Sequence, residues 1–228
     1  MGTVTGIGGG IYDNGEILNI AEYIVSLAGK EKPRLVFLPT ASFDICDEDN
    51  DALKTFVSLG CDCTVLKLTG AGLTYAEAER ILLGADIIYA DGGNLEFMMN
   101  TFSRTGASEI LREAYKRGII LSGLSSGMMC WFAEGYDDCG EDGAFMFVDC
   151  LGILPYSACP HFQGGDWHTF EDAVRGRRYS GFAADNGAAL VYRDGEFSVI
   201  YGNEGGRVYF FDKDKNHRKE IFGGIEPV

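Results

Sequence analysis

Short aliphatic runs alternate with segments of helical spacing through the first half of this chain, and the alternation leaves few folds open to it. The runs are rich in β-branched and large aliphatic residues and are bounded by Gly, Pro or Asp, as buried strands are. They cover residues 35–38, 64–68, 86–89 and 119–121. The segments of helical spacing cover residues 17–28, 52–59, 75–83 and 107–117. This order predicts an α/β fold, a three-layer sandwich in which helices cover both faces of a mostly parallel sheet.

The pattern changes after residue 182, where strand-like runs follow one another through short turns. These runs cover residues 188–192, 197–201 and 208–211. Arg193-Asp194-Gly195-Glu196 separates the first two and contains an Asp-Gly pair of the kind favoured in tight hairpins. We therefore predict a C-terminal antiparallel extension of the sheet. With 228 residues and no segment typical of a linker, the chain is expected to form a single domain over residues 1–228.

The charge of the chain disfavours anionic partners. Its formal net charge is −15, and the basic residues cluster only at Arg175, Arg177 and Arg178. A protein so acidic repels phosphate backbones and anionic lipid surfaces, so we expect neither a nucleic acid nor a membrane as its partner. The first residues, Met1-Gly2-Thr3-Val4, have neither a basic nor an apolar targeting segment, which predicts a cytoplasmic protein.

Two further patterns argue against a metal or an organic cofactor. The seven cysteines have spacings that match neither a disulfide framework nor paired C-x-x-C metal sites, so we expect reduced thiols. Residues 6–10, Gly-Ile-Gly-Gly-Gly, suggest a dinucleotide fingerprint, but the turn-forming residues 11–14 follow where that fingerprint opens a helix. The glycines are therefore interpreted as a structural turn, with a nucleotide site as the less favoured alternative.

The strongest chemical signal is the sequence Gly-Leu-Ser-Ser-Gly at residues 123–127. It follows the predicted strand 119–121 and precedes a helix predicted over 128–133, which is the context of a G-x-S-x-G nucleophile elbow. Such a turn exposes the hydroxyl of its central serine, so Ser125 is the candidate nucleophile. Ser126 is the residue after it, whose backbone N–H the elbow assigns to the oxyanion hole.

A second oxyanion donor is expected from another glycine turn at the end of a strand. Asp91-Gly92-Gly93-Asn94 follows the predicted strand 86–89, which makes Gly92 and Gly93 the candidates. The same turn equally suits the start of a helix near Leu95, with Asn94 as its N-cap.

His161 is the preferred general base among three histidines. It follows Pro160, which stiffens the chain, and it precedes an aromatic residue, whereas His217 lies in a run of charges and His168 has neither feature. An imidazole also needs a group that orients it and stabilises its charged form. Asp185, just before a predicted strand, is the candidate.

Other carboxylates compete with Asp185 for this role. Asp137, Asp138 and Glu141 lie shortly after the elbow. The chain order Ser125, His161, Asp185 differs from the serine, acid, histidine order of α/β-hydrolases, so the motifs point to another fold family.

These motifs resemble the dipeptidase E and cyanophycinase family of serine peptidases, whose fold is related to that of class I glutamine amidotransferases. Residues 38–42, Leu-Pro-Thr-Ala-Ser, are similar to the family's early strand-end motif, and residues 92–94 to its Gly-Gly-Asn turn. Residues 123–127 are similar to its elbow, with Ser126 in place of the usual Ala, and Pro160-His161-Phe162 to its base motif. The resemblance covers most of the chain.

The resemblance implies that Ser125 is the nucleophile and His161 the base of a hydrolase without a cofactor. It puts Asp185 in the place of a Glu found in characterised relatives, while an alternative assignment in the family falls on Asp138. Dipeptidase E relatives prefer an N-terminal aspartyl residue, which a guanidinium would recognise. Arg175 is the candidate for that contact, and Asn94 is expected to bind substrate beside it.

We therefore expect a serine peptidase that hydrolyses short peptides, with Asp-X dipeptides as first candidates. Two alternatives stay open. One is a small-molecule esterase or amidase with the same catalytic residues, and the other is a catalytically silent relative that binds a ligand. An exposed edge strand could support a homodimer.

Overall fold

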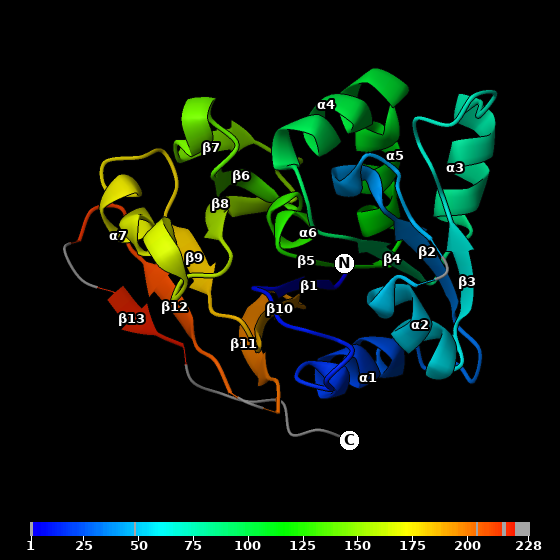
Figure 1. Ribbon diagram of the computed structural model, residues 1–228, viewed down its shortest axis with the longest axis horizontal. Coiled ribbons are helices and arrows are strands. Elements are labelled where there is room, and N and C mark those ends of the chain that lie inside the picture. Colours follow the sequence, from blue (N-terminus) through cyan, green and yellow to red (C-terminus); the bar gives the residue numbers. More distant parts are fainter. Residues whose placement is uncertain (1, 48, 204, 216–217, 222–228) are drawn as a thin grey trace.

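The computed structural model describes residues 2–47, 49–203, 205–215 and 218–221, and it shows an α/β fold with two sheets side by side (Figure 1). The first sheet has seven strands in the order β11-β10-β1-β5-β4-β2-β3. Their bounds are Val4–Ile7 (β1), Arg34–Leu38 (β2), Asp62–Val65 (β3), Ile87–Ala90 (β4), Ile120–Leu124 (β5), Ala188–Arg193 (β10) and Glu196–Tyr201 (β11). Strands β1 to β5 run parallel to one another, β10 runs antiparallel to β1, and β11 runs antiparallel to β10. This arrangement confirms the predicted class, with β10 and β11 as its antiparallel extension.

Helices cover both faces of this sheet because successive side chains of each strand point to opposite faces. In β2, Leu35 and Phe37 belong to the core beneath α1 and α2, whereas Val36 and Leu38 belong to the core beneath the other helices. Figure 1 shows α1 and α2 below the sheet and α4 and α5 above it. The helices are Leu18–Ser26 (α1), Asp51–Ser58 (α2), Tyr75–Leu83 (α3), Leu95–Thr105 (α4) and Ala107–Lys116 (α5).

The second sheet was not anticipated from the sequence, and residues 208–211, which were predicted to extend the first sheet, form one of its strands. It has the order β13-β12-β9-β8-β6-β7, with β6, β8 and β9 parallel. Its strands are Phe132–Asp137 (β6), Met146–Asp149 (β7), Leu154–Cys159 (β8), Gly181–Ala184 (β9), Val208–Phe211 (β12) and Arg218–Glu220 (β13). The remaining short helices are Thr40–Ser42 (η1), Ser126–Met129 (α6), Glu141–Gly143 (η2), Gly165–Thr169 (η3) and Phe170–Ala173 (α7).

The helix after the elbow is shorter than the predicted 128–133, because the chain enters β6 at Phe132. The carbonyl of Cys130 accepts from Leu151 N, and the carbonyl of Trp131 accepts from Leu154 N. These bonds to the next segment replace the bonds that would have continued the helix.

The two sheets share an aromatic core where their edges meet. Phe197 of β11 lies 4.4 Å from Phe182 of β9 and 5.4 Å from Tyr156 of β8, measured between ring centroids. Because large aromatic rings bury extensive apolar area, this contact packs β8 and β9 of the second sheet against β11 of the first.

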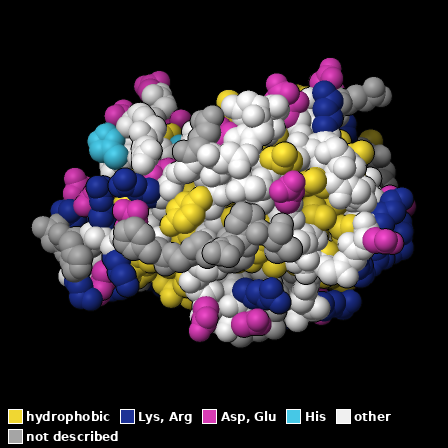
Figure 2. Space-filling model, turned by 90° about the horizontal axis from the view of Figure 1, so that it is seen from below, with side chains coloured by type: hydrophobic (Ala, Val, Ile, Leu, Met, Phe, Trp, Pro, Cys, Tyr) yellow, Lys and Arg dark blue, Asp and Glu magenta, His cyan; other side chains and the backbone are white. Residues whose placement is uncertain are grey.

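The surface seen from the side of α1 carries both signs of charge, with apolar side chains between them (Figure 2). No helix within the described ranges is long and apolar enough to cross a bilayer. All seven cysteines are free thiols.

Candidate active site

Ser125 occupies a sharp turn between β5 and α6. Its φ of 58° and ψ of −116° lie outside the regions that residues with a side chain readily adopt, so the turn is strained. The backbone N–H of Ser125 donates to the carbonyl of Ile7, at 2.9 Å. Gly127 packs against β4 so closely that a Cβ there would collide with the Ala90 carbonyl. The sequence therefore forms the elbow that its glycines predict.

His161 reaches this serine from the loop after β8. Its Nε2 lies 2.8 Å from Ser125 Oγ, and its backbone N–H donates to the Gly8 carbonyl at 3.0 Å. The ring of Trp167 lies edge-on at 5.4 Å. His168 instead bonds Gly165 of its own turn through Nδ1, and His217 lies outside the described residues.

The other imidazole nitrogen faces an amide, because His161 Nδ1 lies 2.6 Å from Asn186 Oδ1. An amide oxygen only accepts, so Nδ1 carries the proton and Nε2 is left as an acceptor for the Ser125 hydroxyl. This tautomer is the one that a general base requires.

The structure does not bring Asp185 to His161, contrary to the expectation from the sequence. Asp185 is fully buried, and its Oδ2 accepts from the backbone N–H of Arg207 at 3.0 Å. Burial raises the pKa of this carboxyl to about 6. The chain turns directly after β9, where Ala188 N donates to the Asp185 carbonyl at 3.3 Å, and in this turn Asn186 meets the imidazole while Asp185 does not.

The alternative carboxylates are also separate from the imidazole. Asp137 is buried at the end of β6, where burial raises its pKa to about 6 even though Cys139 hydrogen-bonds it. Asp138 and Glu141 are exposed. Within the described residues, none of the three hydrogen-bonds His161.

The glycine-rich segment after β1 supports both halves of the site. Successive carbonyls of Ile7, Gly8 and Gly9 accept from Ser125, His161 and Gly187, at 2.9, 3.0 and 3.0 Å. A Cβ on Gly9 would collide with His161 Nδ1 and Asn186 Oδ1. The sequence predicts a structural turn here, but the role of this turn in holding His161 and Asn186 was not anticipated. Three consecutive glycines at a strand end were the available signal.

The second glycine turn lies next to the serine. A Cβ on Gly92 would approach Ser125 Cβ to 3.3 Å, and Ser126 Oγ donates to the Gly93 carbonyl at 2.6 Å. The N–H of Gly92 is engaged by Asp91 Oδ1 at 3.0 Å. By contrast, the N–H groups of Gly93 and Ser126 donate to no acceptor within the part of the chain that the structure describes.

The two residues predicted to bind substrate make other interactions in the structure. Asn94 caps α4, and its Oδ1 accepts from Phe97 N at 2.7 Å. Arg175 pairs with Asp172 at 3.0 Å and lines a depression beside Phe211. The structure therefore does not place Arg175 against Ser125.

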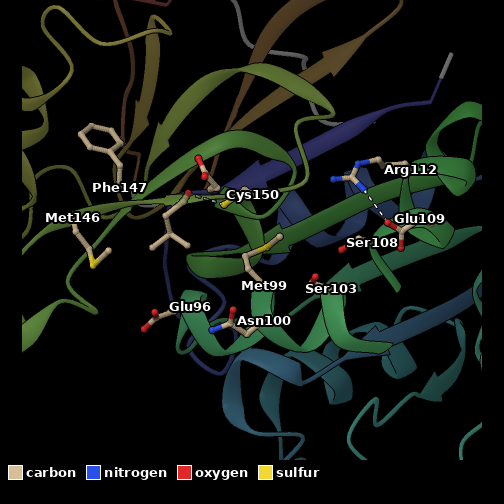
Figure 3. A pocket seen from close by; sticks show the side chains of 12 residues that line it. Glu96, Met99, Asn100, Ser103, Ser108, Glu109, Arg112, Met146, Phe147 and Cys150 are labelled. Atoms are coloured by element: carbon tan, nitrogen blue, oxygen red, sulfur yellow. Dashed lines mark hydrogen bonds and ion pairs between the residues drawn. The ribbon is translucent and has the colours of Figure 1, made fainter. Parts of the chain in front are cut away.

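A cleft of about 440 Å³ lies between α4, α5 and β7 (Figure 3). Its wall carries three carboxylates and the guanidinium of Arg112, which pairs with Glu109 at 3.7 Å. None of the predicted catalytic residues lines this cleft. The serine and histidine therefore belong to a separate site, at the carboxyl ends of the strands.

Comparison with known proteins agrees with these motifs. The sequence model of peptidase family S51 matches residues 5–200. YgaJ of Bacillus subtilis, an uncharacterized peptidase, is 32% identical over 206 residues, which cover 89% of this chain and 88% of the relative. An uncharacterized peptidase of Listeria monocytogenes, Lmo0363, is 27% identical over 149 residues, covering 62% of this chain and 70% of the relative.

Two solved structures share the fold. A peptidase from an acI-B1 Actinobacterium superposes with a TM-score of 0.74 at 18% identity, covering 98% of this chain and 95% of that structure. A putative peptidase E of Listeria monocytogenes superposes with a TM-score of 0.67 at 20% identity, covering 88% and 98%.

Proposed function

The chain belongs to peptidase family S51, a family of serine peptidases, and on that premise we propose that it hydrolyses short peptides through an acyl-enzyme on Ser125. His161 is the general base of this proposal. The observation that carries it is the 2.8 Å contact between His161 Nε2 and Ser125 Oγ on a strained elbow. A nucleophile in hydrogen-bond reach of an oriented base is the arrangement that acyl transfer requires.

The reaction starts when His161 Nε2 takes the hydroxyl proton of Ser125 as Oγ attacks the scissile carbonyl. The N–H groups of Ser126 and Gly93, which lack acceptors among the described residues, donate to the oxyanion of the tetrahedral intermediate. The imidazolium then protonates the leaving amine, and the carbon–nitrogen bond breaks. A water molecule, deprotonated by His161, attacks the ester and releases Ser125.

The proposal leaves the side-chain preference of the substrate to a screen. Asp-X dipeptides come first because of the family resemblance, although Arg175 pairs with Asp172 and does not support that preference. Dipeptides with apolar and basic N-terminal residues complete the set. Activated esters test the alternative of a small-molecule esterase with the same residues.

The test is intact mass after incubation with a fluorophosphonate probe, which labels only an activated serine. We expect one adduct on the wild type and on Ser126→Ala, because the buried Ser126 hydroxyl already donates to Gly93. Ser125→Ala should carry none and should lose at least about 10⁴-fold in peptide hydrolysis. An adduct that persists in Ser125→Ala would contradict the assignment. A wild type without an adduct would favour a silent, ligand-binding relative.

A further inference from the structure

We propose that Asn186, a neutral amide, is the positioning residue for His161, so that this site works without a carboxylate in its third place. The inference rests on the proposed function of Ser125 and His161. An amide differs from a carboxylate in charge: it can fix the tautomer of an imidazole, but it cannot stabilise the imidazolium as a carboxylate does.

The contact itself is short and correctly placed. Asn186 Oδ1 lies 2.6 Å from Nδ1, while the opposite nitrogen lies 2.8 Å from Ser125 Oγ. The three side chains thus form one line of hydrogen bonds from the turn after β9, through the loop after β8, to the elbow after β5. Only an acceptor at Asn186 leaves Nε2 free to accept the serine proton.

The backbone on both sides holds this geometry. Gly187 N donates to the Gly9 carbonyl at 3.0 Å, and His161 N donates to the Gly8 carbonyl at 3.0 Å. Adjacent carbonyls of one segment therefore fix the base and its partner. Gly9 offers no side chain that would separate them, since a Cβ there would collide with both.

The groups that surround the imidazole supply no carboxylate in contact with it. Trp167 and Gly9 are uncharged, and Asp185 is held by Arg207 N. Glu16 approaches Gly187 from the segment before α1, but its Oε2 accepts from Ile11 N at 3.0 Å. Asn186 is thus the group within the described residues that meets Nδ1.

A carboxylate at position 186 would favour the charged imidazolium, so the base would lose its proton only at higher pH. In Asn186→Asp we therefore expect the acid limb of fluorophosphonate labelling rate against pH to move upward by about one unit. Asn186→Leu keeps the approximate size but removes the acceptor, and its labelling rate should fall about 100-fold. Labelling needs no known substrate, and it reads the serine and base directly.

Asn100→Asp is the matched control, because it adds the same charge in the cleft between α4 and β7, where Asn100 is exposed. Its acid limb should stay within about 0.2 units of the wild type, as expected for a screened surface charge. Thermal unfolding of all variants separates loss of fold from loss of positioning, and Asn186→Leu should unfold as the wild type does.

The proposal is overturned if Asn186→Asp moves the acid limb no more than Asn100→Asp, or if Asn186→Leu labels at the wild-type rate. Either result would leave the adduct on Ser125 intact, so it differs from failure of the proposed function, in which the wild type takes no adduct. If the wild type takes no adduct, NMR titration of the His161 ring in wild type and Asn186→Asp replaces labelling. Equal midpoints would then overturn the proposal.

Discussion

The two sheets supply different halves of the site by different means. The first sheet supplies Ser125, and with it the N–H donors of Ser126 and Gly93, from turns that lead directly from a strand into a helix. The second sheet supplies His161 from the loop that follows β8, and Asn186 follows its neighbour β9. The elbow is defined by adjacent residues, whereas the proposed base, His161, is positioned by contacts with residues more than 150 positions away.

The positions of His161 and Asn186 depend on contacts with the first sheet. Neither His161 nor Asn186 is fixed by a local motif. His161 N donates to the Gly8 carbonyl, and Gly187 N, next to Asn186, donates to the Gly9 carbonyl. Gly8 and Gly9 continue β1, an inner strand of the first sheet. The second sheet therefore brings the base to the site, and the first sheet sets its final position.

Gly9→Ala is the strongest test of whether the glycine segment after β1 positions His161. Its methyl group would push against His161 Nδ1 and Asn186 Oδ1, and we expect a loss of about 100-fold in labelling rate, since small displacements of reacting groups are costly. Gly72→Ala is the control, because Gly72 also has a positive φ but nothing lies within 4 Å of its added Cβ. Equal rates in the two variants would show that the first sheet does not position the base.

The two sheets also differ in how much an ion pair contributes to stability. Glu134 of β6 is buried and pairs with Arg177 at 2.7 Å, and the Arg177 guanidinium also lies 4.0 Å from the Phe147 ring. Arg177→Met leaves this carboxylate without its charged partner. We expect about 2 kcal/mol lower free energy of unfolding, discounted because Arg177 itself is partly exposed.

Arg34→Met is the matched change in the first sheet. Arg34 is more than half exposed, and Asp86 keeps a second partner in Lys30, so about 0.5 kcal/mol is expected. Urea unfolding at pH 7 measures both variants. Equal losses would remove the distinction between the more buried pair of the second sheet and the more exposed pair of the first.

The buried carboxyl of Asp137 predicts that the free energy of unfolding depends on pH. Burial raises its pKa to about 6 in the folded protein, so the folded state binds the proton more tightly than the unfolded chain between about pH 4 and 6. Stability should therefore fall as pH rises through this window. Asp185, whose pKa burial also raises to about 6, contributes with the same sign.

Asp137→Asn removes one of these two titrations. We expect it to lessen the fall in unfolding free energy between pH 4.5 and 7.5 by about 1 kcal/mol. The exposed Asp138→Asn should leave the fall unchanged. Chemical denaturation at the two pH values checks both. A fall of undiminished size in Asp137→Asn would assign the pH dependence to other groups.

Local features of the sequence were sufficient for the elbow and for most of the first sheet, although β1 was not among the predicted strands. Hydrophobic periodicity predicts the strands at 35–38 and 86–89 and the helix Tyr75–Leu83. Gly123 and Gly127 predict the turn around Ser125. The second sheet was missed because its strands are interrupted by turns and bury aromatic residues that also suit a short helix, as at Trp131 and Phe132.

The error at Asp185 has a different physical origin. The prediction found the right segment and then chose the more acidic of two neighbours. Both residues lie where the chain leaves β9 and turns, and their side chains meet different partners there. The hydrogen bond from Gly187 N to the Gly9 carbonyl helps to hold Asn186 at the imidazole, and it joins residues far apart in the sequence, so local sequence did not show which neighbour meets His161.

The position of β1 also has a consequence for synthesis of the chain. This strand precedes the other strands described here, yet it lies between β5 and β10, which follow it by about 110 and 180 residues. Its glycine extension meets the histidine and the amide only when β10 has been added. Contacts of such long range form late in folding. A nascent chain therefore holds Ser125 without its proposed base in place until residues up to Gly187 have been made and have joined the fold.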